Sequence, residues 1–285
     1  MVVGAGGGCV AVDRMLSPAQ HAVGPPPEDL AADAIDVASP SGNKLAVWFV
    51  PARDPRALRG VVVLLHGNRA DRRQMLGRAR FLRDAGYVTV LADLSAHGAS
   101  SGTMITLGDR ESLDARAVVQ YARRRVPSAP VAALGFSLGG AALLLALPDL
   151  EVNALIVEGV FPDVETAVRR RLWPRTGWLN DHLSALVLAR IRGRLHIDQH
   201  ALRPVDRIGQ ARCPVFVIGG QRDPFATPDD VERLRAAGPA GTIRWIVPGA
   251  RHGDFHAAAP AEYEKRVGAC LVDAFGASVR GGPSG

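Results

Sequence analysis

The stretch that most constrains the fold is Val131–Gly140, which reads VAALGFSLGG. A short apolar run precedes the pattern G-x-S-x-G and an apolar run follows it, which predicts a strand, a sharp turn and a helix. Gly135 and Gly139 lack the Cβ atoms that would clash where strand and helix approach each other. Such a nucleophile elbow exposes the hydroxyl of Ser137 and leaves the N–H of Leu138 free to face an oxyanion. The alternative is an incidental serine, but the flanking strand and helix favour the functional interpretation.

Strand-like and helix-like segments alternate along most of the chain. Strands are expected over 60–66, 87–92, 154–157, 214–219 and 242–247, and helices over 71–85, 109–125, 140–147, 229–237 and 260–275. Residues 34–38 and 44–50 predict a hairpin of antiparallel edge strands. The unbroken β-branched and leucine run over 60–66 is typical of a strand buried on both faces. The sequence therefore predicts an α/β fold with a mostly parallel twisted sheet covered by helices on both faces.

One segment, over about 161–208, breaks this alternation. It is helical in pattern, rich in arginine and leucine, and contains Trp173 and Trp178. We expect a helical cap insertion over one end of the sheet. Its apolar residues, together with Phe136 and Phe161, would shape a substrate pocket, although the same residues could equally pack the cap onto the body.

The ends of the chain differ in composition from the middle. Residues 1–30 are expected to be a leader and linker, residues 31–276 the main domain, and residues 277–285 a disordered tail. Met1–Val12 is apolar and uncharged but shorter than the ~20 residues of a spanning helix. Two interpretations stay open for it: a remnant of a membrane anchor, or a glycine-rich leader.

A serine nucleophile needs a general base and an acid that orients the base. In the chain order of the elbow motif the acid follows a later strand and the histidine follows the last one. Asp223 comes directly after the strand over 214–219, and His252 follows the last strand. Because ligand sites form outside the carboxyl ends of parallel strands, Ser137, Asp223 and His252 are expected to meet there.

Other residues compete for these roles. Glu158 follows the strand over 154–157 and is the alternative acid, whereas Asp229 and Asp230 fit a helix N-terminus. His256 is the alternative base, four residues after His252. His252 itself has the ordinary interpretation of a histidine in a surface loop.

The second oxyanion donor should come from the loop after the strand over 60–66. That loop begins His66-Gly67-Asn68. Gly67 permits a close backbone approach, so the N–H of Asn68 is the expected partner of the N–H of Leu138. His66 is expected to be a structural hydrogen-bonding residue, since the motif places the base near the C-terminus.

The charge of the chain comes almost entirely from arginine. The net charge is +6, and Lys44 and Lys265 are the only lysines. No basic stripe is interleaved with aromatic residues, which argues against a nucleic-acid partner. A basic patch near an anionic membrane surface is the alternative that stays open. No metal-ligand spacing is present among the three cysteines, Cys9, Cys213 and Cys270.

Beyond the elbow, the chain resembles the serine hydrolases of the α/β-hydrolase fold over roughly residues 33–275. Asp93–Gly102 is similar to the family's D-x-x-G-H-G-x-S-x-G loop, with Ala96 in place of a glycine. Gly219–Asp223 and Gly249–His252 are similar to its acid and histidine loops. Within the family the chain is most similar to bacterial BEM46-like and serine-aminopeptidase-like hydrolases, whose members often carry an N-terminal membrane anchor.

The residues and the resemblance together imply a serine hydrolase. We expect cleavage of a carboxylic ester, thioester or small amide through an acyl-enzyme on Ser137, without metal or organic cofactor. A peptidase activity and a non-catalytic protein that binds a ligand or partner in the same fold are the alternatives. A cytoplasmic location and a membrane-associated one, through the N-terminus, both stay open. The sequence does not give the oligomeric state.

Overall fold

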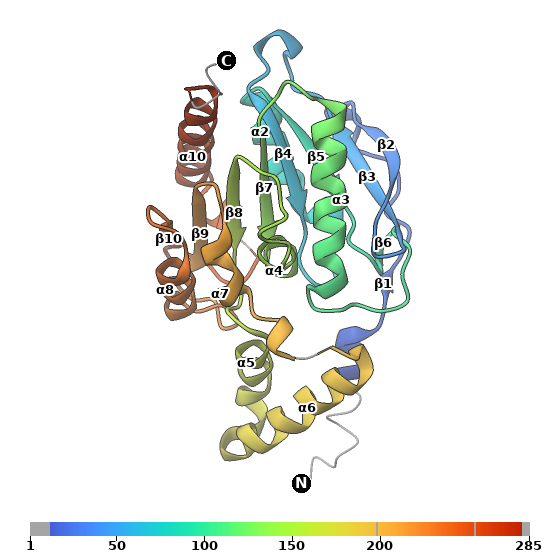
Figure 1. Ribbon diagram of the computed structural model, residues 1–285, viewed down its shortest axis with the longest axis vertical. Coiled ribbons are helices and arrows are strands. Elements are labelled where there is room, and N and C mark those ends of the chain that lie inside the picture. The colour runs from blue at the N-terminus through green and yellow to red at the C-terminus, as the bar shows by residue number, and fades with distance from the viewer. Residues whose placement is uncertain (1–11, 198, 254, 281–285) are drawn as a thin grey trace.

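An eight-stranded sheet forms the centre of the protein (Figure 1). The computed structural model describes residues 12–197, 199–253 and 255–280. The strands are β2 (Asp33–Ala38), β3 (Lys44–Val50), β4 (Gly60–Leu65), β5 (Tyr87–Ala92), β7 (Val131–Phe136), β8 (Ala154–Glu158), β9 (Val215–Gly220) and β10 (Ile243–Val247). Their order is β10-β9-β8-β7-β4-β5-β3-β2. All pairs from β10 to β5 are parallel, which confirms the expected mostly parallel sheet.

The hairpin of β2 and β3 differs from the expectation in one respect. The two strands pair antiparallel from Asp33 opposite Phe49 to Ala38 opposite Lys44. However, β3 also pairs with β5, so of these two strands β2 alone lies at an edge of the sheet, and the prediction of two edge strands is wrong for β3. The physical reason is the unbroken apolar run over 45–50, whose side chains are all buried.

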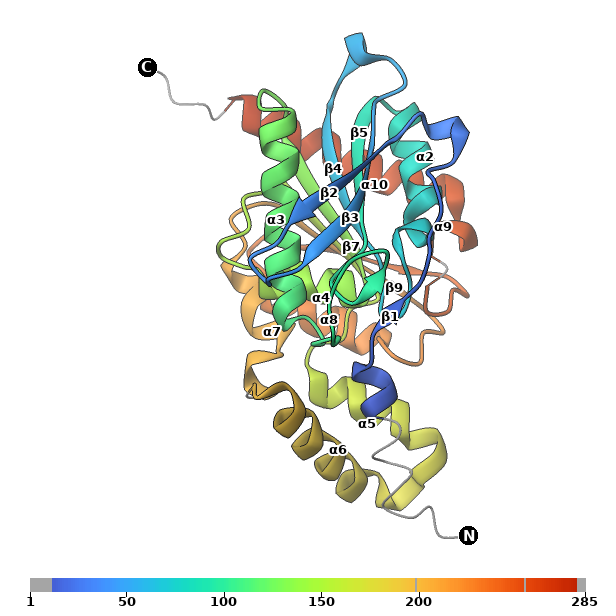
Figure 2. The same ribbon diagram turned by 90° about the vertical axis from the view of Figure 1, so that its right-hand side faces the viewer.

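Helices cover both faces of the sheet, as Figure 2 shows. One face carries α3 (Asp109–Arg125), α4 (Leu138–Leu145), α7 (Pro204–Arg207) and α8 (Pro228–Ala237), and the other carries α2 (Leu76–Asp84), α9 (Phe255–Ala258) and α10 (Pro260–Arg280). Apolar residues recur at helical spacing, for example Ala115, Val118 and Ala122 on α3, and they are buried against the strands. The two faces therefore have separate apolar cores.

The helix expected over 71–85 is divided. Its first turn is the short 3₁₀ helix η3 (Arg72–Met75), and α2 follows it. The side chain of Asp71 accepts a hydrogen bond from the N–H of Arg73 at 2.8 Å, which caps this turn. Other single 3₁₀ turns are η1 (Glu28–Leu30), η2 (Pro55–Ala57), η5 (Gln199–Ala201) and η6 (Ile208–Gln210).

The cap consists of α5 (Val164–Thr176), the turn η4 (Gly177–Leu179) and α6 (Asn180–Leu195). The two helices pack on each other and project from the end of the sheet at which α4 begins (Figure 1). After α6 the chain returns to the body, where α7 packs against α4 and Ile208 is fully buried. The projecting part is therefore shorter than the whole segment 161–208.

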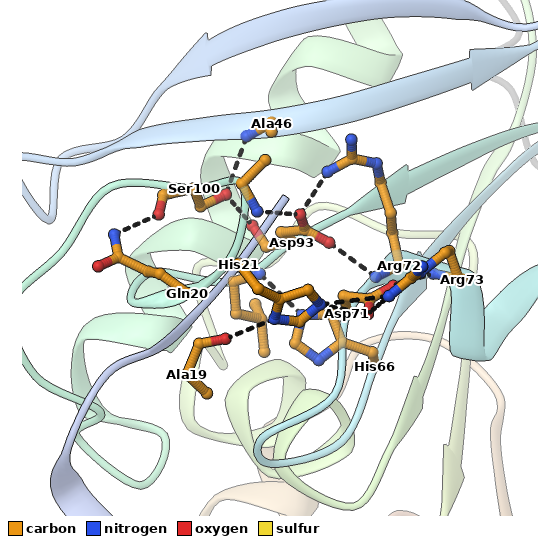
Figure 3. A network of polar contacts seen from close by, with 12 residues as sticks. Ala19, Gln20, His21, Ala46, His66, Asp71, Arg72, Arg73, Asp93 and Ser100 are labelled. Carbon is orange, nitrogen blue, oxygen red and sulfur yellow. Dashed lines mark hydrogen bonds and ion pairs between the residues drawn. The ribbon is translucent and has the colours of Figure 1, made fainter. Parts of the chain in front are cut away.

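The described part of the expected leader, residues 12–30, lies against the domain. Residues 12–16 form a helical turn beside the cap, and β1 (Ala19–Gln20) pairs parallel with β6 (His97–Gly98). Figure 3 shows His21 next to Asp71, with a separation of 2.9 Å between Nε2 and Oδ2. Leu16, Val23 and Leu30 are buried, so apolar burial also holds this segment in place.

Two further features concern only the residues that the structure describes. None of their helices combines the length and apolarity needed to cross a bilayer. They also contain no cluster of three histidine, cysteine, aspartate or glutamate side chains with the arrangement of a metal site. The residues expected as a membrane-anchor remnant, apart from Val12, lie outside this part of the chain, as does the end of the expected tail.

Candidate active site

Ser137 occupies the turn between β7 and α4 with a backbone φ of 50° and ψ of −109°. A non-glycine residue adopts a positive φ only when its surroundings hold it there. Here the N–H of Ser137 donates to the carbonyl of Glu158 at 2.7 Å. A Cβ on Gly135 would lie 2.5 Å from the backbone of Gly139, and one on Gly139 would lie 2.5 Å from the carbonyl oxygen of Leu65. Both glycines are therefore required by the close approach of β7, α4 and β4.

Ser137, His252 and Asp223 form a hydrogen-bonded chain at the carboxyl ends of the strands. His252 Nε2 lies 3.1 Å from Ser137 Oγ, and His252 Nδ1 lies 2.7 Å from Asp223 Oδ2. The other carboxylate oxygen of Asp223 accepts the N–H groups of Phe225 at 2.8 Å and Ala226 at 3.0 Å. The carboxylate is fully buried and is fixed by these contacts, so it can hold the imidazole in one orientation.

The ring of His252 lies between two phenylalanine rings. Its centroid is 4.9 Å from that of Phe136 and 5.3 Å from that of Phe225, and the second contact is edge-to-face at 87°. Phe136 was expected to line the substrate pocket. It instead packs against His252 and Phe255, on the side away from the cavity at Ser137. Its place at the end of β7, directly before the turn, directs the ring to the opposite face of the sheet from α4.

The expected oxyanion donors lie in the same small chamber as Ser137. Asn68 and Leu138 both line it. Among the described residues no protein group accepts the N–H of either residue. The loop after β4 is tied to the elbow because the N–H of Gly139 donates to the carbonyl of His66 at 3.0 Å. Both N–H groups are thus available to a ligand oxygen.

His66 has a structural contact on each ring nitrogen. Nε2 accepts the N–H of Leu94 at 3.0 Å, so the proton lies on Nδ1, which donates to the carbonyl of Gly67 at 2.7 Å. Burial, aided by the nearby ring of His97, lowers the pKa of His66 to about 3. A histidine that stays neutral and is occupied on both nitrogens has no free site for proton transfer.

Glu158, the alternative acid, takes part in a separate buried cluster. Its carboxylate binds Arg78, with 2.6 Å between Oε2 and Nη2, and accepts the hydroxyl of Tyr263. The alternative base, His256, contacts Glu264 at 3.0 Å. Asp230 caps α8 by accepting the N–H of Thr227 at 2.9 Å. Each of these side chains is therefore engaged away from Ser137.

A small inner chamber adjoins Ser137, and a larger outer cavity shares part of its lining. The inner chamber has a volume of about 20 Å³, and Ser137, Leu138, Phe161, Val164 and Arg171 are among its lining residues. This volume holds about one water molecule. The outer cavity has about 300 Å³, and Met15, Asn68, Val168 and Arg171 line both cavities. These four residues therefore form a common wall between the chamber at Ser137 and the outer cavity.

The aromatic residues that the sequence predicts for the pocket do not all lie there. Phe161 lines the inner chamber. Trp178 does not line either cavity, because it lies in the turn between α5 and α6 at the tip of the cap and is 84% exposed. Trp173 belongs to α5, but its side chain lies outside the described ones.

Several lining residues are not predicted by the sequence, and two of them, Met15 and Arg171, matter most for the chemistry of the cavities. Met15 comes from the segment interpreted as a leader, and Arg171 comes from a run of three arginines that has the pattern of a solvated helix face. Helical periodicity places Arg171 one turn after Ala167 and close to Val164 and Val168, which are apolar. That spacing was the only signal for Arg171.

Solved structures share this architecture. An esterase from Pyrococcus furiosus superposes with a TM-score of 0.73 at 20% identity, covering 91% of this chain and 97% of that one. An esterase from Thermogutta terrifontis, with malate bound, gives 0.61 at 16% identity over 86% of this chain and 100% of that one. A serine hydrolase without a lid from Xanthomonas campestris gives 0.56 at 21% identity, over 85% and 93%.

The sequence itself carries the family assignment. No curated protein gives a significant match to the chain. Residues 62–266 match the alpha/beta hydrolase family, and this range runs from β4 to α10 and includes Ser137, Asp223 and His252. By this match and by its strand order, the chain belongs to the alpha/beta hydrolase family.

Proposed function

We propose that the protein is a serine hydrolase that cleaves a carboxylic ester, a thioester or a small amide. The observation that carries this proposal is the hydrogen-bonded chain from Ser137 Oγ through His252 to Asp223, at 3.1 and 2.7 Å. Nucleophile and base lie within hydrogen-bond reach, and the base is oriented by a third group, which is the arrangement that activates a serine hydroxyl.

The reaction follows from these positions. Ser137 Oγ attacks the carbonyl carbon of the substrate while His252 Nε2 takes its proton. The imidazolium then gives this proton to the leaving alcohol, thiol or amine, and the acyl group stays on Ser137. Water, deprotonated by His252, attacks the acyl-enzyme and releases the acid. Asp223 keeps the imidazole in the tautomer that accepts at Nε2 and stabilises the imidazolium.

The oxyanion of each tetrahedral intermediate would be bound by the N–H groups of Leu138 and Asn68. Both residues line the chamber at Ser137. A donor of this kind lowers a barrier by about 3 kcal/mol, because it faces the position where negative charge develops. Leu138 gains further from its place at the start of α4, where the helix dipole favours an anion.

The finer family resemblance also belongs to the proposal. The esterases among the similar structures favour ester cleavage for this chain, and a BEM46-like or serine-aminopeptidase-like relationship adds a short amide as an alternative substrate. The inner chamber of about 20 Å³ favours a small group next to the scissile carbonyl.

The proposal is tested with a fluorophosphonate probe and a substrate panel. The wild type should be labelled and Ser137→Ala should not be, with hydrolysis of short-chain esters lost in the same variant. Thioesters and aminoacyl amides in the same panel separate esterase from peptidase activity. Labelling that persists in Ser137→Ala contradicts the proposal. A wild type that is unlabelled and inert but binds a small acid or lactone tightly would instead indicate a non-catalytic binding protein.

A further inference from the structure

Arg171 lies where the inner chamber at Ser137 and the outer cavity share their lining. It lines both the inner chamber and the outer cavity. Its guanidinium carbon is 5.1 Å from the ring centroid of Phe225, which in turn packs edge-to-face on His252. In the inner chamber it is the only charged residue among the described lining residues. A substrate at Ser137 would therefore pass close to this cation.

Arg171 differs from the other arginines that are removed from solvent. Three of these are bound to carboxylates: Arg72 to Asp93, Arg78 to Glu158 and Arg170 to Asp230. Arg171 has no ion pair among the described residues; Nη1 donates to the carbonyl of Ala167 at 3.0 Å. Burial lowers the pKa of its guanidinium, and the charge of Asp223 opposes this effect. A partly buried cation without a carboxylate is costly unless a ligand supplies the anion.

The outer cavity is also cationic. Arg14 and Arg69 line it together with Arg171, and no described lining residue is acidic. Arg69 Nη1 donates to the carbonyl of Arg14 at 2.8 Å, so its contact is with backbone rather than with a carboxylate.

The nearest carboxylates already have partners. Asp13 lies next to the cavity wall and binds Arg190 at 2.9 Å. Asp223 uses one oxygen for His252 and the other for two backbone N–H groups. Neither acid forms an ion pair with one of the three arginines that line the outer cavity.

We propose that the substrate carries an anionic group, a carboxylate or a phosphate, and that Arg171 binds this group while the scissile carbonyl lies at Ser137. This inference rests on the proposed serine hydrolase function and names its substrate class. A guanidinium binds carboxylate and phosphate oxygens through paired N–H donors, which suits both sources of charge. The three-arginine lining of the outer cavity would attract such substrates before they reach Arg171.

The test compares three methyl esters of equal chain length. Monomethyl glutarate carries a carboxylate, methyl 4-phosphonobutanoate carries a phosphonate, and methyl pentanoate is neutral. Release of methanol gives kcat/KM for each ester. We expect at least one charged ester to be preferred over the neutral one by about tenfold or more, and the better of the two identifies the source of the charge.

Variants on one helix locate the effect. In Arg171→Gln the preference for the charged ester should fall by about tenfold to a hundredfold, and Arg171→Lys should keep part of it. Arg169→Gln is the matched control, because Arg169 is also on α5 but binds Asp181 at 2.6 Å and lines neither cavity. It should keep the whole preference. If Arg171→Gln does not fold, the wild-type preference and competitive inhibition by glutarate decide instead.

Three outcomes overturn the inference. One is a wild type that hydrolyses methyl pentanoate as fast as both charged esters. Another is an Arg171→Gln variant that loses activity equally on all three esters with an altered pH profile, which would make Arg171 a positioning residue for Phe225 and His252. The third is a preference retained in Arg171→Gln. Failure of the hydrolase function itself is distinguishable, since no ester would react and no fluorophosphonate would label Ser137.

Discussion

The carboxyl-terminal end of the sheet and the cap contribute to the site in different ways. At that end of the sheet, Ser137, Asp223 and His252 follow three parallel strands. Backbone hydrogen bonds fix the turn at Ser137 and the carboxylate of Asp223. The cap packs mainly on itself and exposes Leu186 by 65% and Trp178 by 84%. In the proposed function, the chemistry would therefore depend on strand order and strained turns, and the proposed choice of substrate on cap side chains such as Arg171.

The largest effect on activity is expected at the carboxyl-terminal end of the sheet. Ser137→Ala should lower kcat/KM for any ester by about 10⁴-fold or more, because no other described side chain in the chamber can replace the nucleophile. Steady-state kinetics on the best ester of the panel measures this loss. Leu186→Ala, at an exposed position in the middle of α6, is the control and should retain activity. Comparable losses in both variants would remove the distinction between the two regions.

A second prediction concerns the buried cluster of Arg78, Glu158 and Tyr263. Arg78→Met leaves the carboxylate of Glu158 without its cation, and we expect a loss of about 3–5 kcal/mol in the free energy of unfolding. Arg80→Gln, on the same helix, breaks only the exposed pair with Asp29 and should cost less than about 1 kcal/mol. Urea denaturation of both variants gives the comparison. Equal losses would show that burial of the cluster contributes nothing.

Acid should lower the free energy of unfolding through two buried histidines, His66 and His97. Burial lowers the pKa of His66 to about 3 and that of His97 to about 4, below the ~6.5 of an unfolded chain. The unfolded state then binds more protons below pH 6.5, so this stability is complete above pH 6.5 and is lost as the pH falls toward 4 for His97 and toward 3 for His66. At pH 5.5 each histidine should cost about 1.4 kcal/mol.

The difference in unfolding free energy between pH 7.5 and pH 5.5 tests this prediction. His97→Gln should remove about half of the acid-induced loss that the two histidines cause, whereas His182→Gln, at an exposed position on α6, should leave it unchanged. An unchanged pH dependence in His97→Gln contradicts the assignment.

The smallest effect is expected at the tip of the cap. Trp178→Ala should change the free energy of unfolding by no more than about 0.5 kcal/mol, since the side chain is 84% exposed. Ile191→Ala, on the buried side of α6, is the contrast and should cost about 2–4 kcal/mol. Thermal unfolding of both variants is sufficient. A large loss in Trp178→Ala would mean that the tip has a partner in solution.

The sequence was sufficient for features that depend on local pattern. Ser137, Asp223 and His252 could be named because each follows a strand, and the strands are recognisable as apolar runs. Trp178 and Arg171 could not be placed, because the direction of a side chain in an insertion depends on how separate segments pack. Ala96 shows the same limit on a smaller scale: it stands where the family pattern has a glycine, and it adopts a φ of 61°, in the left-handed region that favours glycine.

The position of residues 12–16 has a practical consequence. Val12, Arg14 and Met15 form one wall of the outer cavity, and the strand pair of β1 with β6 holds that wall to the domain. A recombinant protein that begins at Pro25 would keep Ser137, Asp223 and His252 but would lack this wall of the outer cavity and the positive charge of Arg14. Specificity measured on such a shortened protein would not represent that of the protein with residues 12–16 in place. The starting residue must therefore be treated as an experimental variable.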